Sequence, residues 1–127
     1  MGIQLNDCSN LNFELLEFED HLGSLCFNVK LHFDGKDFNF SSQFNFWFDY
    51  TNIDKFIANL KNDKNAVMSS MDHDFDISIE KDGDFFIKIE IKKGGFFSPK
   101  EFRYFDKMSE TGILDLKEFF LNFPKWW

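Results

Sequence analysis

A short acidic segment in the second half of the sequence holds residue types that could bind a metal ion. Asp72, His73, Asp74 and Asp76 stand close together there. Oxygen ligands two residues apart resemble the start of a calcium-binding loop, but no glycine follows at the sharp turn of such a loop and no glutamate completes it. The same spacing is typical of the solvent-facing side of a strand. We therefore predict no metal site.

The sequence contains no recognisable motif for acid–base catalysis, nucleophilic catalysis or phosphate binding. His21, His32 and His73 stand apart, and no serine or cysteine lies in the setting of a nucleophile elbow. Gly94-Gly95 is not followed by the lysine of a phosphate-binding loop. None of the 22 acidic residues stands in an apolar setting that would raise its pKa. We predict that the protein is not an enzyme and has neither catalytic residues nor a cofactor.

Large aromatic residues outside the expected core pattern indicate binding instead. Trp47 and Phe86 fall on the polar sides of their strands, and Trp126 and Trp127 follow the last helix. Such residues are typical anchors of protein interfaces. Alternatively, the end of the chain folds back and buries all four. We predict a partner-binding surface of these aromatic residues and nearby acids: Trp47, Asp72, Asp74, Asp76, Glu80, Phe86 and Trp127.

The charge balance restricts the class of partner. The chain has 127 residues, 14 of them basic and 22 acidic, which gives a formal net charge of −8. Nucleic-acid binding requires a basic surface that displaces counterions from phosphates, so direct binding to nucleic acid or to an anionic membrane is not expected. A basic protein would be attracted to this charge.

Residues 1–127 are expected to form a single domain, because no linker-like segment interrupts them. Cys8 and Cys26 do not form a disulfide framework. Residues 1–10 lack the pattern of a signal peptide, and no apolar run is long enough to span a membrane. We predict a cytoplasmic protein.

Alternating apolar residues predict the strands that must position these side chains. In the first half we expect strands at residues 13–18, 25–33 and 38–48, followed by a helix capped by Thr51. A two-residue turn at Asp34-Gly35 would place Leu31 opposite Phe38 and His32 opposite Asp37 on the solvent face.

The second half repeats this order. Strands are expected near residue 66 and at residues 75–80, 85–91 and 99–105, before a final helix that Pro124 ends. A two-residue turn at Asp82-Gly83 would send charged side chains inward. An odd-numbered loop, such as Asp82 to Asp84 with positive φ at Gly83 or a neighbour, keeps the isoleucines of both strands on one face. We therefore predict a three-residue loop or a bulge.

Apart from the short strand near residue 66, these elements predict an α+β fold in the order βββα-βββα. We expect one antiparallel sheet of about six strands with two helices packed on one face, since alternating strands need cover on one side only. The two helices share the phase of their apolar stripes, so an internal repeat is an alternative interpretation. The strand order within the sheet stays open.

The chain resembles the WapI-type immunity proteins of bacterial polymorphic toxin systems. The resemblance covers roughly residues 25–123 and lies in the layout of elements and aromatic residues. Its segments are residues 44–48 before a short capped helix, residues 74–79, the hairpin at residues 80–92, residues 94–97, and the closing amphipathic helix.

The resemblance implies an immunity protein that neutralises the carboxy-terminal domain of a cognate toxin in the cytoplasm. Such toxins are often basic nucleases, and an acidic inhibitor can cover the surface that would receive phosphates. The principal alternative is a different protein-binding or homodimeric module with no toxin partner. A small enzyme or metal-binding protein is the third.

Overall fold

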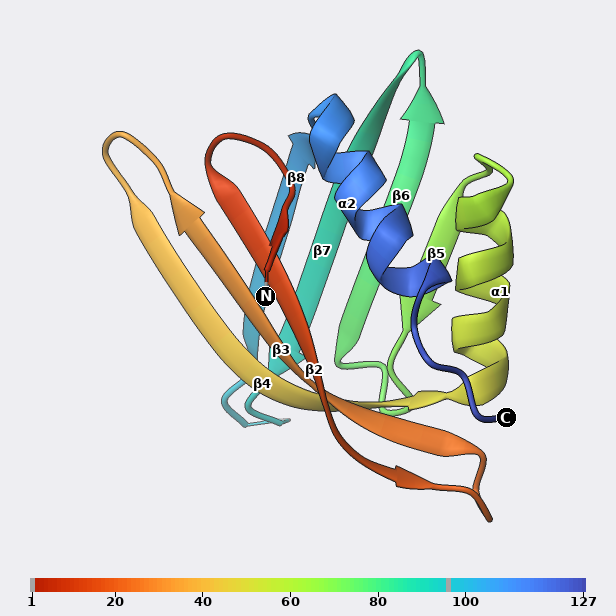
Figure 1. Ribbon diagram of the computed structural model, residues 1–127. Helices are drawn as coiled ribbons and strands as arrows, with labels where there is room; N and C mark the ends of the chain where they lie inside the picture. The colour runs from red at the N-terminus through yellow and green to blue at the C-terminus, as the bar shows by residue number, and fades with distance from the viewer. Residues whose placement is uncertain (1, 96) are drawn as a thin grey trace.

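The computed structural model describes residues 2–95 and 97–127, so Phe96, which belongs to the resemblance above, lies outside the described residues. Within them the fold is α+β, as predicted, with two helices and two antiparallel four-stranded sheets (Figure 1). The elements in chain order are β1 (Ile3–Gln4), β2 (Ser9–Glu19), β3 (Ser24–Asp34), β4 (Asn39–Asp49), α1 (Tyr50–Lys61), β5 (Ala66–Ser69), β6 (Phe75–Asp82), β7 (Asp84–Lys93), β8 (Lys100–Lys107) and α2 (Glu110–Leu121).

The strands form two sheets rather than the single sheet that we expected. The first sheet has the order β1-β2-β3-β4 and the second the order β5-β6-β7-β8. α1 follows β4 directly and carries the chain away from the first sheet, so β5 begins a new one. β1 was not predicted because two residues are too few to show alternation.

The inner faces of the two sheets pack against each other through phenylalanine rings. The ring of Phe75 on β6 lies 4.7 Å from that of Phe46 and 5.9 Å from that of Phe48, both on β4. All three side chains are buried. In Figure 1, α2 (blue) lies between the first sheet and α1 (yellow-green), and the rings of Phe56 and Phe120 join the two helices at 5.0 Å.

Each helix packs mainly on the half of the chain that does not contain it. α1 packs on β5, and α2 packs on β1. The Ser109 N–H donates to the Leu5 carbonyl at 3.0 Å, just before α2 begins. A Cβ atom at Gly112 would lie 2.2 Å from the same carbonyl oxygen, so only glycine allows this close approach.

The hairpin between β3 and β4 exists, but its predicted two-residue turn is wrong. Asp34 lies opposite Asn39, so the loop between them is longer. Gly35 does not adopt the positive φ that a type I′ turn requires. His32 therefore faces Ser41, not Asp37, and the two side chains are hydrogen-bonded at 2.7 Å. The observed register differs from the predicted one by an even number of residues, so the apolar side chains lie on the same face of the sheet as predicted.

The odd-numbered connection between β6 and β7 is confirmed. Asp82 lies opposite Asp84, and Gly83 between them has a φ of 73°. Ile79 consequently lies opposite Ile87, and both side chains are buried.

The predicted start of α1 is wrong, because the helix begins at Tyr50 and Thr51 is already inside it. The Tyr50 N–H donates to the Gly23 carbonyl at 2.8 Å, so the turn between β2 and β3 supplies a partner for the helix start. α2 ends at Leu121, before Phe123 and Pro124.

Candidate functional site

The predicted acidic residues do not form one open patch. Asp74 accepts a hydrogen bond from the buried Ser70 hydroxyl at 2.6 Å and forms an ion pair with Lys93, also at 2.6 Å. Asp76 accepts a hydrogen bond from the Ser69 hydroxyl. These two carboxylates therefore stabilise the connection between β5 and β6, whereas Asp72 and Glu80 are exposed.

The predicted aromatic residues on the strands lie on different sheets. Trp47 is half-buried on the outer face of the first sheet, opposite Cys26. Phe86 is half-buried on the outer face of the second sheet, opposite Glu80. Its ring stacks on that of Phe105, with centroids 5.8 Å apart and planes 1° apart. Phe105, which is 63% exposed, belongs to this surface and was missed.

The last two residues fold back onto α1 and the β2–β3 hairpin. Trp127 stacks on the Tyr50 ring with centroids 4.2 Å apart, and its indole N–H donates to Asp54 at 3.0 Å. The Trp126 indole N–H donates to Asp20 at 3.0 Å. The end of the chain therefore folds back, but Trp126 remains 39% exposed, and the two indoles do not cover Trp47 or Phe86. The predicted partner-binding residues occupy separate parts of the molecule.

Two pKa values are shifted beside the C-terminal indoles, those of Asp20 and Tyr50. The Tyr50 hydroxyl donates to Asp20 at 2.6 Å, and this bond, with the one from Trp126, lowers the pKa of the Asp20 carboxyl. Burial, followed by the bond to Asp20, raises the pKa of the Tyr50 hydroxyl.

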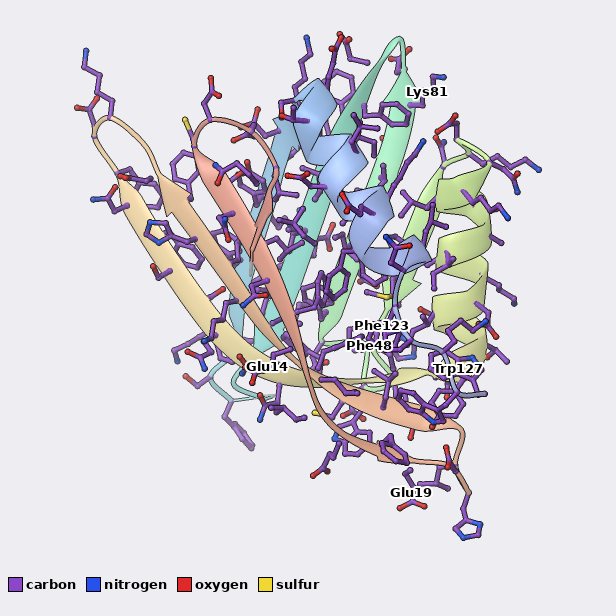
Figure 2. The ribbon with its side chains drawn as sticks, viewed as in Figure 1. Glu14, Glu19, Phe48, Lys81, Phe123 and Trp127 are labelled. Atoms are coloured by element: carbon purple, nitrogen blue, oxygen red, sulfur yellow. The ribbon has the colours of Figure 1, made fainter. Side chains whose placement is uncertain are left out.

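A groove that we did not predict runs between α2 and the edge of β2, with a volume of about 710 Å³. Figure 2 labels one lining residue from each side, Glu14 on β2 and Phe123 after α2. Its apolar lining residues are Ile3, Phe13, Phe119, Phe123 and Pro124. Its acidic lining residues are Glu14, Asp115 and Glu118. Of the described residues, no lysine, arginine or histidine lines it.

Helical spacing explains how α2 forms its side of the groove. Asp115, Glu118, Phe119 and Asn122 recur at intervals of three and four residues and therefore share one face. This face lies next to the buried stripe that contains Leu116 and Phe120. The sequence predicts this apolar stripe, but it does not predict which strand the stripe packs against.

The β2 side of the groove is an open sheet edge. β1 pairs with β2 only at Asn10 and Leu11, and from residue 12 onwards no strand among the described residues pairs on this side. The lining includes Asn12, Phe13 and Glu14, whose side chains alternate between the two faces of the sheet. The groove therefore follows the backbone edge itself.

In the part of the chain that the structure describes, no three His, Cys, Asp or Glu side chains are close enough to hold a metal ion. No helix there is long and apolar enough to cross a membrane. The chain matches no known protein family, no curated protein and no solved structure.

Proposed function

We propose that the protein is a cytoplasmic immunity protein that binds a cognate bacterial toxin domain and blocks its active or substrate-binding surface. The observation that carries this proposal is the groove between α2 and β2. Three carboxylates and an apolar floor, with no basic side chain among the described lining residues, fit a basic and partly apolar protein surface.

The electrostatics of the whole chain support the same class of partner. The net charge of −8 favours encounter with a basic protein, and this attraction is screened by salt. A basic nuclease domain combines positive charge with a surface that binds phosphates, so an acidic inhibitor that occupies this surface excludes the substrate. The resemblance to immunity proteins points to a toxin as this partner.

Co-expression with the protein encoded by the neighbouring gene tests the proposal. We expect the two proteins to co-purify, the affinity to fall as salt is raised, and the chain to protect cells from the toxicity of that neighbour. A toxic neighbour that neither co-purifies with the chain nor is neutralised by it would refute the proposal.

The stacked rings of Phe86 and Phe105 favour a second candidate function, self-association through the outer face of the second sheet. Phe105 is largely exposed, and exposed aromatic pairs are frequent at interfaces. Sedimentation of the isolated chain distinguishes the candidates: a tight dimer that Phe105→Ser dissociates supports a homodimeric module.

A further inference from the structure

We propose that the edge of β2 binds an extended basic segment of the partner as an added strand, whose side chains enter the groove beside α2. The inference rests on the proposed function for the identity of the partner, but not for the chemistry of the segment. It names the binding mode, the surface and the sequence pattern that the surface recognises.

The backbone of β2 supplies the first argument. An unpaired edge presents N–H and C=O groups that can pair with another strand, and proteins usually shield such an edge. Here β1 shields only Asn10 and Leu11, and α2 packs on β1. The register of β2 against β3 shifts between Leu15 and Glu17, where a bulge interrupts the edge. The register of β1 against β2 brings Gly2 beside Asn12, and both line the groove, so an added strand would pair with residues 13–15 and continue the line of β1.

The groove supplies the second argument, because it lies beside the same residues. Alternate side chains of an added strand point to opposite faces, so every second one would enter the groove. The floor is already packed: the Phe13 ring lies 5.9 Å from that of Phe119 and 5.3 Å from that of Phe120. The groove therefore offers apolar contact without rearrangement of these rings.

The charges supply the third argument and identify the occupant. Glu14, Asp115 and Glu118 are exposed, and none of them forms an ion pair with another described residue. Lysine or arginine side chains on the incoming segment would compensate all three. The surface therefore fits a strand in which basic and apolar residues alternate, and an acidic segment would be repelled.

A short peptide of alternating lysine and valine tests the inference with the intact chain. We expect it to bind and to shift the backbone amide NMR signals of residues 13–15. The variant E14Q/D115N/E118Q should bind about tenfold more weakly, since three exposed ion pairs are lost. The matched control D7N/D37N/D82N removes three exposed carboxylates that do not line the groove and should bind as the parent does.

A second peptide separates strand pairing from attraction by charge alone. It has the same side chains, but every backbone amide is N-methylated, so that it cannot donate hydrogen bonds to β2. We expect its binding to be lost. Equal binding of the two peptides, or amide shifts that avoid residues 13–15, would overturn the inference.

The outcomes also separate this inference from the proposed function. If the neighbouring protein binds and the groove variant does not weaken it, the added strand is refuted while the inhibitor function stands. If the lysine–valine peptide pairs with β2 but no toxic neighbour is neutralised, the inference stands and the immunity function fails.

Discussion

Replacing Phe75 with alanine should weaken the packing between the two sheets more than any change at their rim. Phe75 is 0% exposed, and its ring touches Phe46 and Phe48 from the opposite sheet. The substitution removes buried ring area and leaves a cavity, which costs about 3–5 kcal/mol for phenylalanine. This is a large part of the roughly 5–15 kcal/mol that stabilises a typical domain.

Guanidinium unfolding followed by circular dichroism measures this loss, and Phe40→Ala is the matched control. Phe40 also stacks across the sheets, on Phe102 with centroids 4.0 Å apart, but it is only half-buried. We expect its loss to cost about 1–2 kcal/mol, since less area leaves water and no closed cavity forms. A double-mutant cycle between Phe46 and Phe75 should give a coupling of about 0.5–1.5 kcal/mol. If Phe75→Ala costs no more than Phe40→Ala, the described packing of the sheets is refuted.

Thiol and tyrosine chemistry provide two further predictions. Cys8 is exposed, whereas burial raises the pKa of the Cys26 thiol. Iodoacetamide should therefore modify Cys8 in the native protein and Cys26 only after unfolding. Mass spectrometry that shows rapid modification of both thiols in the native protein would contradict this. Burial is the main cause that raises the pKa values of Tyr50 and Tyr104. The folded state therefore favours the neutral hydroxyls: this stabilisation is complete below about pH 10, the ordinary pKa of tyrosine, and is lost as pH rises through the folded pKa values. Absorbance titration should detect tyrosinate at higher pH in the native than in the denatured protein, and coincident curves would show that neither hydroxyl is shielded.

Local patterns of the sequence predicted the fold class and the faces of the strands, but not which strands pair. The alternation of apolar residues predicted the connection at Gly83, because only a loop with an odd number of residues keeps Ile79 opposite Ile87. The same reasoning failed at Gly35, since a register shifted by an even number of residues preserves the apolar face equally well. The division into two sheets depends on contacts between residues far apart in the chain, such as Phe46 with Phe75, which alternation does not reveal.

The candidate site was largely hidden from the sequence for the same reason. Glu14 and Asp115 are about a hundred residues apart and meet only because α2 returns to the first half of the chain. Acidic residues at alternate strand positions suggested an open face, but Asp74 has a neighbouring serine and a distant lysine as partners. The predicted aromatic residues Trp47, Phe86 and Trp127 all lie outside the groove.

Because each helix packs mainly on the other half of the chain, the order of synthesis on the ribosome affects folding. The first sheet emerges before β6 and α2, so its phenylalanine-rich inner side stays uncovered until both have left the exit tunnel. Neither half can therefore complete folding during translation by itself, and the nascent chain should depend on chaperones that hold apolar surface until release. A fragment that stops at α1 should remain soluble only when the other half is supplied in trans.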